Sequence, residues 1–376
     1  MKKKDPTAIH STLLLIGGFL GAGKSSVIRS LVKMAQERGM RCGLVTNDQG
    51  EGLVDTALGR ATGVAVREVP GGCFCCRADA LVAALRAIQE EREPDIYFAE
   101  PVGSCTDLVA TVLRPIQEIY RLPLRVAPMT VVVDAVRFRD DFTGGRRRKG
   151  FSKGVRYIWL KQLEEAEVIV LNKADALRAG EAEILARKIA GDWPGKRIVP
   201  ASTRTGEGMV ELFDLLCGTE AVRSPAMEVD YALYGAGEAE LGWLNARAAV
   251  SFGKADAAHD FLLRLASSMQ SRIEALDVEL AHLKLSLASD EQAGALAVVQ
   301  SVRNGSPPEV TSRMQAVVEG GTLTVNLRAE SAPAVLERVL REALASLQAG
   351  GVVSSISELQ AFRPGQPKPT HRILAA

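Results

Sequence analysis

The sequence predicts an α/β fold in which a larger domain with a mostly parallel sheet precedes a smaller α+β domain. The chain has 376 residues, more than one ordinary hydrophobic core accommodates. Short apolar strands alternate with amphipathic helices as far as Leu216. The alternation then fades, and small, acidic and glycine residues dominate. We therefore expect a first domain at residues 1–222, a linker at 223–242 and a C-terminal domain at 243–376.

The elements of the first domain follow one another with short connections. An apolar strand from Leu13 to Ile16 leads into a glycine-rich loop and a helix from Val27 to Arg38, which Gly39 caps. Open parallel sheets bind ligands beyond the carboxyl ends of their strands, so functional residues are expected in the loops there. The other expected strands are Cys42–Thr46, Val64–Val69, Asp95–Ala99, Met129–Asp134, Val168–Leu171 and Arg197–Pro200, and the other helices include Asp79–Glu91 and Val155–Glu165.

The first of these loops has the spacing of a phosphate-binding loop. Gly18 and Gly23 are separated by four residues and followed by Lys24 and Ser25. Glycines let backbone N–H groups turn toward phosphate oxygens, and the next helix adds its N-terminal dipole. Lys24 would bind the β- and γ-phosphates, and Ser25 would ligate Mg²⁺. The alternative is a turn without a ligand. We predict a P-loop NTPase domain whose phosphate cradle is Gly18, Gly21, Ala22, Gly23, Lys24, Ser25 and Ser26.

A second motif, Asn172-Lys173-Ala174-Asp175, follows an uninterrupted apolar strand. The Asp175 carboxylate can accept two hydrogen bonds from guanine, from the ring N–H and the exocyclic amine, and adenine offers no matching pair. A buried acceptor that the wrong base leaves unpaired discriminates strongly. The motif therefore favours GTP over ATP. Ser202 and Thr203, in the next strand-to-helix loop, would complete the base pocket.

A third motif, Glu100-Pro101-Val102-Gly103, follows the strand that ends at Ala99. A nucleotide hydrolase needs a carboxylate here to hold Mg²⁺ through water, and a glycine whose N–H meets the γ-phosphate. A plain strand-terminating turn would also explain the proline and the glycine. With Lys24, we predict Glu100 and Gly103 as the catalytic groups.

Three cysteines, Cys73, Cys75 and Cys76, lie within four residues after two glycines. Thiolates at this spacing can bind Zn²⁺ or another borderline metal, and Asp48 or Glu51 could add an oxygen ligand. Structural burial and redox sensing are the alternatives. The other cysteines are interpreted as core or incidental residues, although Cys105 lies just beyond the Glu100 loop; they are Cys42, Cys105 and Cys217.

The balance of charge excludes some classes of partner. The chain carries 46 basic and 45 acidic side chains, which leaves no electrostatic footprint for nucleic acid. No run of 18 apolar residues suggests a membrane span, and the apolar run near the N-terminus is too short for a signal peptide, so a cytoplasmic protein is expected. The basic loop at residues 144–150 is interpreted as a solvated insertion rather than a docking site.

The predicted elements of the second domain follow a different order, with two βαβ-like halves around a hairpin. This pattern predicts a small α+β domain of ferredoxin-like type, in which no catalytic cluster is visible. Its expected elements are strands at Arg247–Phe252, His282–Leu287, Arg313–Val318, Leu323–Arg328 and Val352–Phe362, helices at Ala255–Ala275 and Ala332–Gln348, a short helix from Asp290, and a turn at Glu319-Gly320-Gly321.

Taken together, the phosphate loop, the Gly71-Gly72-Cys73-Phe74-Cys75-Cys76 segment, Glu100 to Gly103 and Asn172 to Asp175 resemble the CobW-like GTPases of the CobW/HypB/UreG nucleotide-binding group. The resemblance implies slow GTP hydrolysis coupled to metal delivery, with the cysteines as the metal site. By position in these motifs, Asp48 would lie in the first switch, where it could ligate Mg²⁺ or Zn²⁺. The chain departs from the family in having Gln49 where an aromatic residue is usual and no histidine in the linker.

The predicted function is therefore a Mg²⁺-dependent GTPase that binds zinc, or cobalt, and delivers it to a client metalloprotein. A homodimer is compatible with this prediction. One alternative is a GTPase chaperone for a cofactor-dependent enzyme, such as a corrinoid protein, with structural cysteines. Another is a redox-regulated interaction module that binds nucleotide and barely hydrolyses it.

Overall fold

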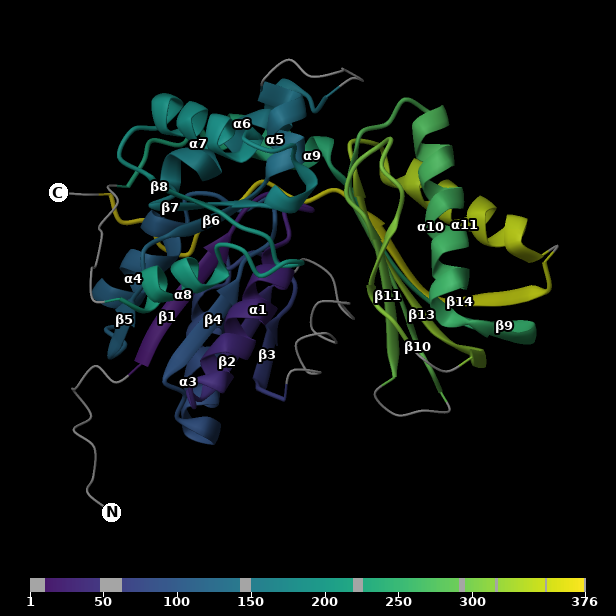
Figure 1. Ribbon diagram of the computed structural model, residues 1–376, viewed down its shortest axis with the longest axis horizontal. Helices are drawn as coiled ribbons and strands as arrows, with labels where there is room; N and C mark the ends of the chain where they lie inside the picture. Colours follow the sequence, from purple (N-terminus) through teal and green to yellow (C-terminus); the bar gives the residue numbers. More distant parts are fainter. Residues whose placement is uncertain are drawn as a thin grey trace.

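The computed structural model describes residues 11–47, 63–142, 150–218, 226–290, 295–314, 317–348 and 350–374, with the side chains of 254–257 left aside. Asp48, Glu51 and the basic loop fall outside these ranges, so the predictions made for them are not addressed by the structure. Figure 1 shows a mixed helix-and-strand part, which contains the first half of the chain, beside a second sheet with two long helices on its outer side.

The first part of the chain forms a mostly parallel sheet, as predicted. Within the described residues its order is β3-β2-β4-β1-β6-β7-β8, and β5 pairs with β1. Every pairing is parallel, so the carboxyl ends of the strands lie at one edge. The strands are β1 (Ser11–Gly17), β2 (Cys42–Asn47), β3 (Ala65–Val69), β4 (Ile96–Glu100), β5 (Leu124–Val126), β6 (Thr130–Asp134), β7 (Val168–Asn172) and β8 (Arg197–Pro200).

Alternation along the strands divides the core into two layers. In β1, Leu13 and Leu15 face one layer, and Leu14 and Ile16 face the other. Helices α1 and α8 cover the second layer, while the remaining helices cover the first. The helices are α1 (Lys24–Glu37), α3 (Ala78–Arg92), α4 (Arg114–Glu118), α5 (Ala135–Phe142), α6 (Lys153–Glu165), α7 (Glu181–Asp192) and α8 (Met209–Cys217), with short π and 3₁₀ turns at Val109–Leu113 and Ala174–Ala176.

The segment that we expected to be an irregular linker contains a helix, α9 (Tyr231–Glu240). The Asp230 carboxylate caps it by accepting from the N–H groups of Ala232 and Leu233. The helix packs closely on α6, because a Cβ on Gly237 would lie 2.4 Å from the carbonyl oxygen of Gly154. Gly154 and Gly237 therefore allow a close contact between the two helices. The predicted domain boundaries are not tested by this contact.

The second sheet is antiparallel, with the order β12-β11-β10-β13-β9-β14. Its inner strands β10, β13, β9 and β14 have the ferredoxin-like order, and β11 and β12 extend the edge beside β10. Apolar residues of one face pack under two helices. The elements are β9 (Gly242–Ala257), α10 (Ala258–Ala275), β10 (Leu280–Ala288), β11 (Leu296–Ser301), β12 (Glu309–Ser312), β13 (Val317–Ala329), α11 (Pro333–Gln348) and β14 (Val352–Phe362).

One local prediction for this domain, a hairpin turn, was wrong. The expected hairpin turn at Glu319-Gly320-Gly321 is part of one continuous strand, β13, in which the register with β9 shifts between Val318 and Gly320. A Cβ on Gly320 would lie 2.3 Å from the carbonyl oxygen of Val250, so the glycine serves a close approach of strands. The short helix expected from Asp290 falls on residues 291–294, which lie outside the described ranges, and the described chain resumes with β11.

A buried arginine is one of the links between the two sheets. Arg137, on α5, donates to the carbonyl oxygen of Leu280 at 2.9 Å and to that of Val302, and pairs with Glu279 at 3.4 Å. After β14 the chain returns to the first sheet, where Arg372 binds Asp107 at 2.7 Å. None of the described helices combines the length and the apolar character that a membrane span requires.

Candidate nucleotide and metal sites

The phosphate loop joins β1 to α1 at the carboxyl edge of the parallel sheet. Gly18 has a φ of +131°, and a Cβ there would lie 2.2 Å from the carbonyl oxygen of Val132, so only glycine fits. The Lys24 side chain is buried, and its Nζ donates to the carbonyl oxygen of Gly18 at 3.0 Å. The ammonium group therefore lies across the loop, where a phosphate would be bound.

Ser25 and Glu100 meet beside this loop. The Ser25 hydroxyl donates to Glu100 Oε1 at 2.8 Å. Gly103 lies against the same loop, since a Cβ there would be 3.0 Å from Lys24 Nζ and 2.7 Å from Leu20 Cδ2. A hydroxyl and a carboxylate form a hard, all-oxygen donor set, which fits Mg²⁺. The fold thus brings the predicted catalytic residues together.

The predicted base motif divides into two roles. Asn172 Nδ2 donates to the carbonyl oxygen of Ala22 at 2.9 Å, and Lys173 Nζ binds the carbonyl oxygen of Gly21 at 3.0 Å and Asp134 at 2.6 Å. These two side chains therefore brace the phosphate loop. These hydrogen bonds connect the segment that contains Asn172 and Lys173 directly to the phosphate loop.

Asp175, the predicted base-reading carboxylate, lies beside the phosphate loop at a second cavity. Together with Thr203 it lines a cavity of about 540 Å³ that also reaches Gly23 and Ser26. Ser202 is fully buried and donates its hydroxyl to Asp175 Oδ1 at 2.7 Å. Ser202 thus positions the carboxylate, and Arg204 lies 3.6 Å from its other oxygen.

The three cysteines of the motif form a compact sulfur cluster. The sulfur atoms of Cys73 and Cys75 are 2.7 Å apart, those of Cys73 and Cys76 are 3.2 Å apart, and those of Cys75 and Cys76 are 3.7 Å apart. Tetrahedral zinc, with Zn–S bonds of about 2.3 Å, separates its sulfur ligands by about 3.8 Å. The three ligand atoms could surround such an ion after small side-chain adjustments.

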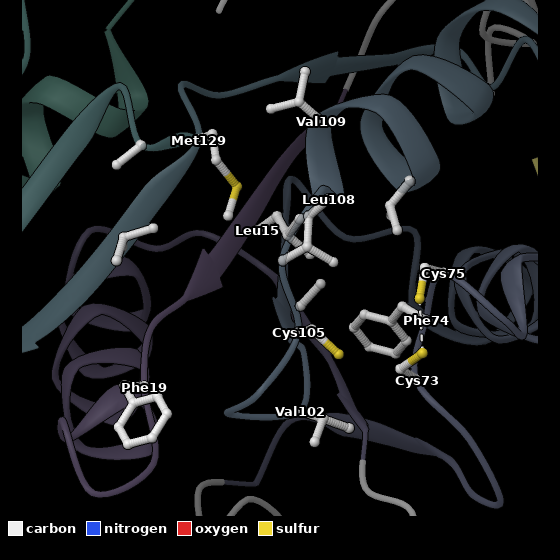
Figure 2. Packing of buried hydrophobic residues seen from close by; sticks show 14 of the residues in the cluster. Leu15, Phe19, Cys73, Phe74, Cys75, Val102, Cys105, Leu108, Val109 and Met129 are labelled. Carbon is white, nitrogen blue, oxygen red and sulfur yellow. Dashed lines mark hydrogen bonds between the residues drawn. The ribbon is translucent and has the colours of Figure 1, made fainter. Parts of the chain in front are cut away.

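Cys105, which the sequence interpretation left as incidental, adjoins this cluster. Figure 2 shows its sulfur turned toward the side on which Phe74 and Cys73 lie. The thiols of Cys105, Cys75 and Cys76 hold the pKa of Cys73 well below its usual range, and burial raises the pKa of Cys105. A lowered pKa favours the thiolate form, which is the form that binds metal. The sequence signal was its position two residues after Gly103.

Asn47 links the cysteine segment to the nucleotide cavity. It ends β2 and lines the cavity that contains Lys24 and Ser25. Its side-chain amide donates to the carbonyl oxygens of Val69 and Gly72, each at 2.7 Å, and its Oδ1 accepts from the Phe74 N–H at 2.8 Å. One buried side chain therefore holds the backbone that presents the cysteines.

A second link runs through the loop after Glu100. Val102 and Gly103 line the same nucleotide cavity, and Cys105 faces the sulfur cluster. Gln162, buried on α6, donates to the carbonyl oxygens of Gly103 at 3.0 Å and Cys105 at 2.8 Å. The glutamine fixes both ends of this short segment, so a shift at Gly103 would reach Cys105.

The C-terminal segment lies over the cysteines. The Lys368 N–H donates to the sulfur of Cys76 at 3.2 Å, and the Thr370 N–H donates to the carbonyl oxygen of Cys75 at 2.8 Å. Cys73 and Cys75 are 5% and 1% exposed, so a metal would reach them past this segment. Nothing in the local sequence after β14 indicated this contact.

The second sheet also reaches the nucleotide cavities. The cavity at the phosphate loop, about 70 Å³, is lined on one side by Lys24, Ser25 and Glu100 and on the other by residues of β9, β10, β11, β12 and β13. The larger base-side cavity is bordered by β11 and β12. Sequence reasoning had assigned no site to this domain.

Comparison with known proteins agrees with the motifs. Two curated relatives are "Zinc chaperone CobW" from Sinorhizobium sp., 29% identical over 44% of this chain and 51% of its own length, and "Zinc chaperone YeiR" from Escherichia coli K12, 26% identical over 46% and 49%. The chain therefore spans about half the length of these curated relatives.

Similar solved structures include HypB from Helicobacter pylori in complex with nickel, 14% identical, covering 57% of this chain and 92% of that one with a TM-score of 0.40. Zn(II)-bound YjiA GTPase from E. coli is 17% identical and covers 90% and 98%, with a TM-score of 0.34. The profile described as "CobW/HypB/UreG, nucleotide-binding domain" matches residues 12–199, half of the chain. The chain therefore belongs to the CobW/HypB/UreG family, and this region is its nucleotide-binding domain.

Proposed function

We propose that the protein binds GTP with Mg²⁺, hydrolyses it slowly to GDP and phosphate, and couples the nucleotide state to the binding and delivery of a transition metal. Zinc is the proposed metal, with cobalt as the second choice, and the recipient is a client metalloprotein. The names of the two curated relatives support zinc. The order of the four motifs, and their convergence at one edge of the sheet, supports the nucleotide part.

The residues of the phosphate loop have distinct proposed roles. Lys24 binds the β- and γ-phosphates, the Gly103 N–H meets the γ-phosphate, and Asp175 reads guanine. Ser25 and Glu100 would hold Mg²⁺, which neutralises charge that develops on the phosphates. Within the described lining of this cavity, Glu100 is the one carboxylate, and it is engaged with Ser25. That engagement leaves it poorly placed to activate water, which supports slow turnover.

The main support for this proposal is the pair of links between the nucleotide cavity and the cysteine cluster. Asn47 lines the nucleotide cavity and holds the cysteine segment, while the Gly103–Cys105 loop touches both. A nucleotide that orders either link changes the geometry of the sulfur atoms, so nucleotide and metal affinities become coupled. By thermodynamic necessity the metal would change nucleotide affinity by the same factor.

A competition titration tests this function directly. Zn²⁺ and Co²⁺ are titrated into reduced protein with and without GTP·Mg²⁺, using wild type and a Cys73→Ser, Cys75→Ser, Cys76→Ser variant. We expect tight zinc binding that GTP changes at least fivefold and that the variant loses. Cys217→Ser is the matched control, because Cys217 is a half-buried thiol at the end of α8. A GTP effect below about twofold contradicts coupling.

One observation favours a second function. Cys73 and Cys75 are buried, and the C-terminal segment binds the backbone of Cys75 and the thiol of Cys76. Buried thiols under a covering segment suit a structural role in a GTPase chaperone for a cofactor-dependent enzyme. Pull-down of a corrinoid enzyme by protein free of bound metal would favour this alternative. Reversible loss of GTP binding on oxidation, without metal affinity, would favour the redox module.

A further inference from the structure

One face of the C-terminal sheet is polar where it meets the first domain. In β10, Leu283, Leu285 and Leu287 pack under the helices, so the alternate residues His282 and Lys284 point to the opposite face. The same alternation in β13 places Leu327 in the core and Asn326 and Arg328 on the polar face. A ferredoxin-like sheet thus presents basic side chains on the face that its own helices leave uncovered.

Strand register gathers these side chains into two adjacent rows. Lys284 lies opposite Asn326 on one side and Gln300 on the other. In the next row, His282 lies opposite Arg328, which lies opposite Trp243. All six line the cavity that contains Lys24, Ser25 and Glu100 (residues Trp243, His282, Lys284, Gln300, Asn326 and Arg328). Strands far apart in the sequence therefore build one surface facing the phosphate loop.

This surface touches the loop itself. A Cβ on Gly21 would lie 3.0 Å from the carbonyl oxygen of Ala281, in β10, and 3.0 Å from Val302 Cβ. The buried Arg137 anchors the same two backbone regions through the carbonyl oxygens of Leu280 and Val302. The phosphate end is also the narrow end, about 70 Å³ against about 540 Å³ on the base side. An anion held there would be close to both walls.

The charges on the C-terminal wall suit an anion. Lys284 is 5% exposed and Arg328 is 2% exposed, although both belong to the sheet's polar face. Arg328 is fixed by the ring of Trp243, 4.0 Å below its guanidinium, and by donation to the carbonyl oxygen of Leu244 at 2.9 Å. Buried cations beside Lys24 make this end of the cavity electropositive, and a phosphate group carries the opposite charge.

The surface of the C-terminal sheet also extends to the larger cavity, which Asp175 lines. Gln300 and Thr311 border both cavities, as do Gly23, Ser26 and Arg29 from the phosphate-loop side. Arg204, which pairs with Asp175, also pairs with Glu309 of β12 at 3.4 Å. The extra strands β11 and β12, which extend the ferredoxin-like order, therefore lie along the whole groove from phosphate to base.

We propose that the C-terminal sheet is the second wall of the nucleotide site, and that Lys284 binds a phosphate oxygen of the bound nucleoside triphosphate across the cavity from Lys24. This inference rests on the proposed GTP binding and adds a nucleotide-contacting role for the second domain. It also explains how the C-terminal domain would sense the nucleotide, because loss of the γ-phosphate removes charge between the two walls.

The test measures nucleotide affinity in the full chain. Affinities for GTP and GDP, with Mg²⁺, are compared among wild type, Lys284→Gln and Arg247→Gln. Arg247 is the matched control, because it is a basic residue of β9 in the same sheet that lies outside both cavities, is 46% exposed and pairs with Glu358. We expect Lys284→Gln to weaken GTP binding about tenfold or more. The control should stay within about twofold, as expected for an exposed pair.

Two outcomes overturn the proposal: a loss below about threefold in Lys284→Gln, or an equal loss in Arg247→Gln. Should Lys284→Gln fail to fold, hydrogen exchange on the wild type decides the question. GTP·Mg²⁺ should then slow amide exchange in residues 280–286 as well as in the phosphate loop, and protection of the loop alone contradicts the second wall. Wild type that does not bind GTP would instead refute the proposed function.

Discussion

The two sheets of this protein present function in different ways. In the parallel sheet, the residues expected to bind nucleotide and metal lie in short contiguous loops, such as Gly18 to Ser26, that follow buried strands. In the antiparallel sheet, the side chains at the nucleotide cavity come one or two at a time from five strands, with Trp243 and Arg328 more than eighty positions apart. The residues of the first arrangement can be recognised in the sequence as motifs. Those of the second can be grouped into a site only when the strand register is known.

The contrast has a physical cause. A parallel sheet delivers every loop after a strand to one edge, so a run of neighbouring residues can build a site. An antiparallel sheet presents a face, and along any strand every second residue belongs to it. Polar residues on that face, such as Lys284, look in the sequence like ordinary solvent-facing positions. The variants below test how far the two sheets act together.

Arg137→Ala should have the largest effect, because Arg137 joins the two sheets. The change leaves Glu279 and the carbonyl oxygens of Leu280 and Val302 without this buried cation. We expect a loss of about 3 kcal/mol in the free energy of unfolding, and separate unfolding of the two sheets in urea. Arg139→Ala, on the same helix but paired at the surface, should cost less than about 1 kcal/mol. A single urea unfolding transition at the wild-type midpoint would contradict the role of Arg137 in joining the two sheets.

Asp175→Asn tests a residue of a contiguous motif. The carboxamide cannot accept both guanine donors, so we expect GTP affinity to fall about 100-fold. Xanthosine triphosphate, which has an acceptor oxygen in place of the exocyclic amine, should bind the variant better than GTP. Competition with a fluorescent nucleotide measures both affinities, with Asp192→Asn, at the exposed end of α7, as control. Unaltered base preference would remove Asp175 from the site.

Cys105→Ser sharpens the comparison within the first sheet, since Cys105 was not part of a recognised motif. Because its thiol adjoins those of Cys73 and Cys75, we expect zinc affinity to fall about tenfold while the three motif cysteines still bind. Thiolate-to-Co²⁺ charge-transfer absorption should weaken in parallel. Cys217→Ser should leave both unchanged. If Cys105→Ser does the same, Cys105 is only a core residue.

At pH 5 Glu165→Gln should have the smallest effect of these variants, because Gln replaces a carboxyl group that is protonated in the folded protein; the effect should grow as pH rises. Burial raises the pKa of Glu165 to about 8, so the folded protein keeps a proton that the unfolded chain releases above pH of about 4.5. The stability that this group contributes is present below about pH 4.5 and is lost as pH rises to 8, by at most about 1.4 kcal/mol per pH unit. The variant should flatten that decline in denaturant titrations between pH 5 and 8. Glu211→Gln, on exposed α8 surface, should retain the full slope.

Sequence reasoning identified the parallel sheet because its patterns are local. The strand before Gly17, the glycine spacing and the apolar run before Asn172 each specify one strand-loop-helix unit, and the fold confirms those units. The same reasoning placed a hairpin turn at Gly320, where the structure has a continuous strand. Glycine is as useful for a close strand contact as for a turn, and pairing of β13 with β9, some seventy residues away, decides between them.

By itself, the sequence determined the kinds of chemistry present: a phosphate loop, a carboxylate that we expect to read guanine, and a cluster of thiols. These depend on residue type and short spacing, which local backbone geometry translates directly into a site. Tertiary structure alone decided which other groups join them. Asn47 reaches the cysteine backbone, Cys105 adjoins the sulfur atoms, and Lys284 faces Lys24 across the cavity. These contacts arise from packing between distant segments, where many side chains of the same types could have met instead.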